Sequence, residues 1–167
     1  VTMLYLGIES GLEDVLAFMK KDHTLPQAYE QIQRLQEAGM VYGAHFMTGI
    51  AGAGRGLENA RATAEFLNRT QPQRLINFSM FLHKKAPLYQ DIQSGKFLPA
   101  SELENMQEER ELLSLLDGFA CSYDGFHDFV TLRVRGILPK DRDALVAKLD
   151  QAIAQQQGKE PVFALVE

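Results

Sequence analysis

The sequence has very little cysteine, no long apolar run and no excess of basic residues. Cys121 is the single cysteine among 167 residues, so the chain can build neither an internal disulfide nor a cysteine metal site. No stretch approaches the length of a membrane-spanning helix, and the N-terminus lacks the pattern of a secretory signal. The formal net charge of −5 does not favour a nucleic acid as the main partner. These absences predict a cytoplasmic protein without a membrane segment.

Strand and helix patterns alternate along the first 116 residues. Apolar runs typical of buried strands occupy 3–8, 40–49 and 74–82. Helical spacing of apolar residues follows them over 12–21, 25–38, 57–69 and 101–116. Thr24 and Ser101 stand where helix caps are expected. This alternation predicts an α/β fold of parallel βα units.

The pattern changes after Asp117, which predicts two units. Residues 1–117 carry the βα units, and residues 118–167 mix extended pieces, turns and a helix into an accessory α+β segment. Three parallel strands alone would leave two unpaired edges, and the chain starts with Val1 rather than Met. We therefore expect a fragment: half of a TIM-like barrel with a C-terminal α+β extension, which self-associates through its exposed strand edges.

Polar residues lie at the predicted strand ends, where α/β barrels carry their active sites. Glu9 follows the first strand, His45 lies within the second, and Ser79 and His83 lie at or beyond the third. The Glu9 carboxylate suits sugar hydroxyls, but the N–H groups of the following helix would satisfy it equally well. His45 on an apolar strand is either a ligand-binding group or a hydrogen-bonded core histidine. The sequence pattern leaves both pairs of alternatives open.

A glycine-rich loop, GIAGAGRG at 49–56, follows the second strand. Its spacing is not that of the dinucleotide-binding fingerprint, and it lacks the Lys-Ser/Thr of a P-loop. Glycines let backbone N–H groups approach a phosphate, but they also suit a tight connection between strand and helix. Both interpretations stay open.

Four short motifs occur in a specific order: GIESG at 7–11, KKDHT at 20–24, EAG at 37–39 and GIAG at 49–52. This order resembles the second half of the radical S-adenosylmethionine (SAM) barrel. The branch it resembles holds elongator-type enzymes, methylthiotransferases and oxygen-independent coproporphyrinogen oxidases. APLYQDIQSGKF at 86–97 is similar to the segment after the last strand of that barrel, and the resemblance covers roughly residues 3–116.

The resemblance implies a set of SAM-contacting residues: Glu9, Ser10, Lys21, His45 and Gly49. Glu9 would contact the ribose or the methionine end of SAM, and Lys21 the methionine carboxylate as a single point charge. His45 would lie near the ribose, and Gly49 near the adenine.

Two departures from the family pattern limit what this chain does alone. Ala51 stands where relatives have proline, and the three-cysteine motif that binds the [4Fe–4S] cluster is absent. We therefore expect SAM and a [4Fe–4S] cluster in a full-length parent enzyme of unknown substrate. In this chain we expect no catalytic residue, no metal ligand and no activity. The alternatives are a self-contained α/β domain that binds a nucleotide or phosphate, and a noncatalytic oligomerising module.

Overall fold

The computed structural model describes residues 3–166. Its helices are α1 (Glu13–Phe18), α2 (Leu25–Glu37), α3 (Gly56–Thr70), α4 (Leu88–Gln93), α5 (Glu102–Leu115) and α6 (Arg142–Gln156). Its strands are β1 (Met3–Glu9), β2 (Val41–Thr48), β3 (Arg74–Ser79), β4 (Leu82–His83), β5 (Cys121–His127), β6 (Leu132–Leu138) and β7 (Leu165–Val166). The three predicted strands are present as β1, β2 and β3, although β3 ends earlier than predicted. No helix within the described range is long and apolar enough to cross a membrane.

The two predicted helix caps are confirmed. Thr24 caps α2 and Ser101 caps α5, each through a reciprocal capping box with the residue three positions later, Gln27 and Glu104 respectively. In such a box the cap side chain and the later side chain each accept a hydrogen bond from a backbone N–H that the helix leaves unpaired. Gly39, just beyond α2, has a φ of 71°, the left-handed conformation that commonly ends a helix.

The main sheet has the strand order β1-β2-β3-β5-β6. β1, β2, β3 and β5 are parallel neighbours, and β6 is antiparallel to β5. The prediction of parallel βα units is confirmed, and the described residues form an open sheet rather than a closed barrel. The sheet runs across the boundary predicted at residue 117, because β5 covers the edge of β3 that was expected to be unpaired. The outer edge of β1 has no strand partner among residues 3–166.

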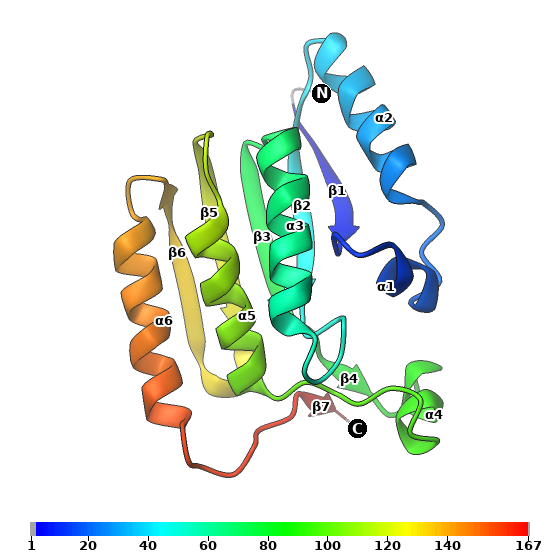
Figure 1. Ribbon diagram of the computed structural model, residues 1–167, viewed down its shortest axis with the longest axis vertical. Coiled ribbons are helices and arrows are strands. Elements are labelled where there is room, and N and C mark those ends of the chain that lie inside the picture. Colours follow the sequence, from blue (N-terminus) through cyan, green and yellow to red (C-terminus); the bar gives the residue numbers. More distant parts are fainter. Residues whose placement is uncertain (1–2, 167) are drawn as a thin grey trace.

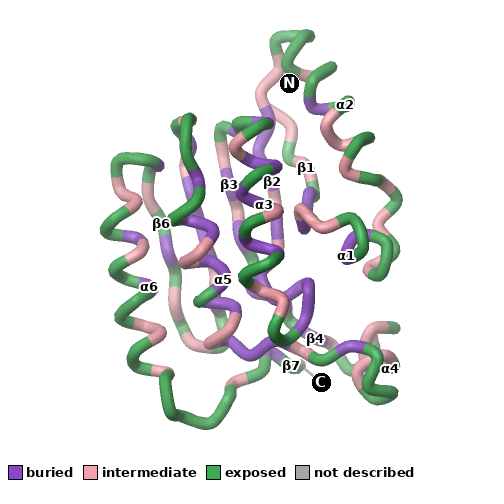
Figure 2. Tube along the Cα trace, viewed as in Figure 1, coloured by how far each residue is buried: buried purple, intermediate pink, exposed green. Residues whose placement is uncertain are grey.

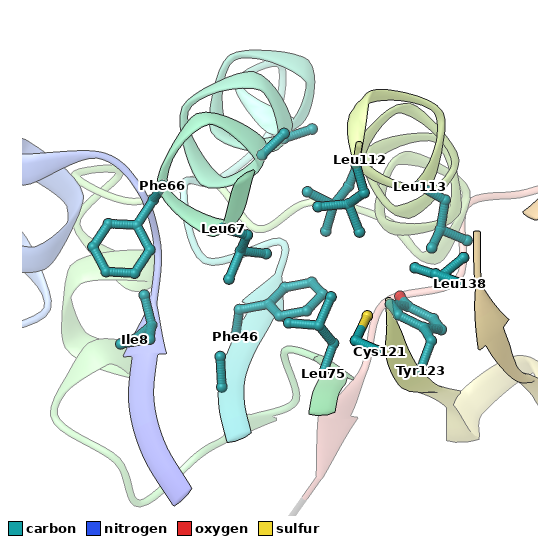
Figure 3. Close-up of a cluster of buried hydrophobic side chains, with 14 of the residues drawn as sticks. Ile8, Phe46, Phe66, Leu67, Leu75, Leu112, Leu113, Cys121, Tyr123 and Leu138 are labelled. Atoms are coloured by element: carbon teal, nitrogen blue, oxygen red, sulfur yellow. The ribbon is translucent and has the colours of Figure 1, made fainter. Parts of the chain in front are cut away.

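A layer of helices packs on one face of the sheet. Figure 1 shows α3, α5 and α6 side by side in front of the strands, with α2 beside β1. Alternate strand residues point into this layer, and Figure 3 shows Phe46, Leu75 and Tyr123 directed at Leu67 and Leu112 of the helices. Because side chains alternate between the faces of a strand, the intervening residues lie on the opposite face.

That opposite face carries no helix of the main layer, and we call it the open face. Its members include Tyr5, Gly7, His45, Arg74, Phe78, Asp124, Phe126, Arg133 and Arg135. Tyr5 is 49% exposed and Ile137 50%, and Figure 2 shows pink and green positions alternating with purple ones along the strands. Parallel sheets are usually covered on both faces, so this face is unusual for a parallel sheet.

A second, smaller apolar cluster lies at the C-terminal ends of the strands. It is built from α1, α4 and the loops between them, around Val15, Ile50 and Phe97. The C-terminal segment returns to this end, where β7 pairs with β4 (Figure 1). The N–H of Glu102, the first residue of α5, donates to the carbonyl of Val162 at 2.8 Å. The tail is therefore hydrogen-bonded to the end of the sheet where the candidate site lies.

Candidate functional site

Glu9 and Lys21 form an ion pair at the C-terminal end of β1, with Lys21 Nζ 3.0 Å from Glu9 Oε1. Lys21 reaches back because the chain reverses after α1: the N–H groups of Lys20 and Lys21 donate to Ala17 and Leu16, and Lys20 is left-handed with a φ of 56°. This double hydrogen bond is a Schellman helix end. The side chains keep 19% and 32% of their surface exposed, so the pair remains accessible to a ligand.

Glu9 itself has a backbone conformation that disfavours any residue except glycine. Its φ is 64°, and the pairing of β1 with β2 shifts register between Gly7 and Glu9, which makes a β-bulge. A left-handed conformation costs about 1–2 kcal/mol for a residue with a side chain. Strain of this kind clusters at functional sites, and here it aims a carboxylate along the open face.

Gly7 and His45 lie beside this carboxylate. A Cβ on Gly7 would be only 2.8 Å from Glu9 Oε1, so the missing side chain leaves the space that the carboxylate occupies. Gly7 pairs with His45 on β2, which places the imidazole next to the ion pair on the open face. The structure thus brings Glu9, Lys21 and His45 together, although they come from three separate segments.

His45 belongs to a row of aromatic side chains that crosses the open face. Its ring centroid is 5.5 Å from that of Tyr5 and 5.8 Å from that of Phe78. Phe78 stacks on Phe126 at 5.2 Å, and the Arg133 guanidinium covers Phe126 at 4.4 Å. His45 therefore makes ring contacts on the open face and is not part of the main core.

Ser10 and Gly49 face the helix layer instead. Ser10 is fully buried, and its Oγ donates to Asn59 Oδ1 on α3 at 2.5 Å. The N–H of Gly49 donates to Glu108 Oε2 on α5 at 2.8 Å, and Asn59 Nδ2 donates to Glu108 Oε1 at 2.6 Å. One relay thus joins the loop after β1 to the loop after β2 through Glu108. Ser10 and Gly49 therefore anchor these two loops to the helix layer.

Ser79 and His83, the other polar residues predicted at the strand ends, also lie away from Glu9 and Lys21. Ser79 is buried, and its Oγ donates to Glu102 Oε1 at 2.7 Å. His83 lies in β4, where its Nδ1 accepts a hydrogen bond from the N–H of Lys85 at 3.0 Å. The polar residues at the predicted strand ends therefore do not all gather at one place.

A buried ionic cluster between β5 and α5 is the main feature that the sequence did not reveal. His127 is fully buried and bridges two carboxylates, with Nδ1 3.1 Å from Glu102 Oε2 and Nε2 2.5 Å from Glu109 Oε2. Tyr123 donates to the other oxygen of Glu109 at 2.5 Å. The glutamates are themselves buried. Two signals were present in the sequence: Ser79 and His127 are polar residues at strand ends, and α5 carries five glutamates.

Burial and pairing shift the pKa values of this region. Burial lowers the pKa of His127, but the hydrogen bonds and charges of Glu102 and Glu109 raise it more, to about 9. The imidazole is therefore cationic at neutral pH. Burial also raises the pKa of Glu108 to about 7, against the lowering effect of the Gly49 and Asn59 donors. Glu108 thus changes charge near neutral pH where it holds the Gly49 loop.

Several backbone N–H groups of the glycine-rich loop already donate hydrogen bonds within the protein. The N–H groups of Gly52 and Ala53 donate to backbone carbonyls, and that of Gly54 donates to Glu104 at 2.9 Å. A carboxylate already occupies the position that a phosphate would take, which argues against a phosphate cradle there. A cavity of about 370 Å³ lies beside this loop, between α1 and the stretch around Phe97.

The described residues do not fit an iron–sulfur cluster. No group of three or more histidine, cysteine or acidic side chains within residues 3–166 is arranged to hold a metal ion. Cys121 is buried, and burial raises the pKa of its thiol to about 12. A cluster needs several thiolates, so its ligands would have to come from another segment.

Comparison with known proteins gives a relationship at the level of the fold. No family model and no curated protein matches the chain. Among solved structures, the chain is similar to Elp3 of the archaeon Methanocaldococcus infernus, determined with residues 1–46 deleted, with a TM-score of 0.66 and 20% sequence identity. The match covers 92% of this chain and 37% of that one. The two proteins therefore share a fold, and the likeness includes most of residues 118–167 as well.

Proposed function

We propose that this chain is the SAM-binding half of a radical SAM enzyme. Glu9 carries the proposal: its strained backbone holds a carboxylate paired with Lys21 at the C-terminal end of the open face. The amino-acid end of SAM carries an ammonium and a carboxylate, which match an acid and a base that lie 3.0 Å apart. The motif order GIESG, KKDHT, EAG and GIAG and the likeness to Elp3, an elongator-type radical SAM protein, support this assignment.

The open face is then the inner wall of a barrel that another segment completes. Residues outside this chain would supply the [4Fe–4S] cluster, since those described do not fit one. SAM held beside a reduced cluster supplies hydrogen-atom abstraction from a substrate. This chain's share is to bind and orient SAM: Glu9 and Lys21 hold the methionine end, His45 faces the ribose, and Gly49 shapes the loop near the adenine.

The test is a titration of the purified chain with SAM, followed by amide NMR. We expect weak, saturable shifts at Gly7, Glu9 and His45, because the cluster normally anchors the methionine end. Glu9→Gln should remove them, while Glu111→Gln on the outer surface of α5 should not. Shifts confined to other residues would refute the assignment, and micromolar affinity by calorimetry would contradict the role given to the cluster.

The unpartnered edge of β1 supports one further expectation, self-association. An exposed strand edge offers free backbone groups to another chain. Tyr5→Lys adds a charge on this edge and should shift sedimentation velocity toward monomer, whereas Leu57→Lys, at a similarly exposed position on α3, should not. If the wild type stays monomeric at every concentration, self-association is refuted. The alternative of a noncatalytic oligomerising module is then refuted as well.

A further inference from the structure

The open face has a second polar region, across the sheet from Glu9, on β3, β5 and β6. The side chains form a grid that follows the strand register. Arg74 on β3 pairs with Ser122 on β5, and Ser122 pairs with Ile137 on β6. In the next row Asp124 pairs with Arg135. A hollow of about 270 Å³ lies among these five residues.

The hydrogen-bond donors around this hollow outnumber its acceptors. Asp124 is the single acid that lines it, and both carboxylate oxygens already accept from Arg133, at 2.8 and 2.7 Å. Arg135 Nε remains 3.9 Å from Asp124, beyond hydrogen-bond distance. These bonds from Arg133 also lower the pKa of Asp124. The carboxylate therefore stays ionised, and both of its oxygens already accept hydrogen bonds.

Arg74 lies close enough to Asp124 to interact with its charge, but within residues 3–166 neither Arg74 Nε, which is buried, nor the Ser122 hydroxyl is satisfied by a hydrogen bond. A buried donor without an acceptor is destabilising, because it has lost its hydrogen bonds to water. Three arginines also lie near two aspartates, Asp124 and, beside Arg133, Asp128, which leaves a local excess of positive charge in a chain whose net charge is −5. A bound anion would accept hydrogen bonds from the unsatisfied donors and would balance the excess positive charge.

We propose that this hollow is an oxyanion-binding site, held by Arg74, Arg135 and Ser122, whose preferred occupant is a phosphate group. The forked guanidinium donors of arginine match the oxygens of phosphate or carboxylate. Two guanidinium groups that converge from different strands favour an anion with several charged oxygens, which phosphate provides. The site shares no residue with the proposed SAM contacts, which come from β1, β2 and the segments that follow them.

The test is a titration of the full chain with inorganic phosphate at constant ionic strength, followed by the amide signals of Ser122 and Gly136. We expect saturable shifts. Arg135→Gln and Arg74→Gln should each weaken the dissociation constant about tenfold, the order that one charge-assisted hydrogen bond contributes. Asp124→Asn should tighten binding, because it removes a repelling charge and releases Arg133.

Arg61→Gln is the matched control, since Arg61 is exposed on α3 and its one ion pair within residues 3–166 is with Glu111. It should leave phosphate binding unchanged. The side chain of Arg135 is 66% exposed, so its variant tests the site even where Arg74→Gln fails to fold. A parallel titration with acetate identifies the source: tighter acetate binding keeps the oxyanion site and assigns its occupant as a carboxylate. Non-saturating shifts with both anions, or equal weakening in Arg61→Gln, would overturn the proposal.

Discussion

Glu108 on α5 accepts a hydrogen bond at 2.8 Å from the backbone N–H of Gly49, a residue 59 positions earlier in the chain. Its second oxygen accepts from Asn59, which in turn accepts from Ser10. The helix layer therefore holds both site loops through one carboxylate. A Cβ on Gly49 would lie 2.5 Å from Asn105 Oδ1, so this close approach also explains the glycine.

The first prediction concerns the charge of Glu108. Burial raises its pKa to about 7, so its carboxylate should gain a proton as the pH falls through neutrality and weaken its bond to Gly49. The amide signal of Gly49 should therefore titrate with a midpoint near pH 7. Glu108→Gln should abolish that titration and Glu111→Gln should preserve it. A Gly49 amide that ignores pH in the wild type would contradict the assignment.

The second prediction concerns His127 and the pH dependence of stability. Its pKa in the folded protein, about 9, lies above the ordinary value of 6.5, so the folded state holds a proton that the unfolded chain releases between these values. The stabilisation is fully present below about pH 6.5 and is lost as the pH rises through about 9, by up to about 1.4 kcal/mol per pH unit. Urea unfolding across this window measures the slope. The prediction would be refuted if NMR showed that the His127 imidazole of the folded protein loses its proton below pH 6.5.

The sequence predicted local features well because their causes are local. Thr24 and Ser101 cap helices through side chains three residues apart, and the apolar run at 40–49 is long enough to identify β2 by itself. The motif order also picked out Glu9 and Lys21, which the structure places in contact.

The buried ionic cluster could not be predicted because its partners are distant along the chain. Glu102 and Glu109 meet His127 only once α5 packs on β5, 25 and 18 residues away. Acids on a charged helix are usually solvated, so nothing local marks these two as buried. The place of β5 in the main sheet was hidden for a related reason. CSYDGFH mixes polar residues with apolar ones, and the partners of Tyr123, Asp124 and His127 lie in other elements.

The third prediction concerns Gly125, which lies beneath the ionic cluster. A Cβ there would be 1.9 Å from Glu109 Oε1, so Gly125→Ala must displace a buried carboxylate from His127 and Tyr123. We expect a loss of about 3 kcal/mol in the free energy of unfolding. Gly7→Ala is the matched control on another strand. Its nearest contact is the partly exposed tip of Glu9, so it should cost under about 1 kcal/mol. Equal losses in the two variants would show that the cluster does not explain the cost.

The fourth prediction separates binding from stability at Glu9. Relief of its left-handed conformation is worth about 1–2 kcal/mol, while a partly exposed ion pair such as that with Lys21 contributes about 0–1 kcal/mol. Glu9→Gly should therefore leave the stability unchanged or raise it by up to about 2 kcal/mol, yet it should abolish the SAM-dependent shifts at Gly7 and His45.

Gln71→Gly provides the comparison for this variant. Gln71 is also left-handed, with a φ of 50° at the end of α3, and its side chain makes no ion pair. Gln71→Gly should gain about as much stability from the relief of this conformation as Glu9→Gly does, and it should keep the SAM-dependent shifts. If Glu9→Gly instead loses more than about 1 kcal/mol relative to Gln71→Gly, the carboxylate stabilises the fold. The strain at position 9 would then be explained by structure rather than by ligand binding.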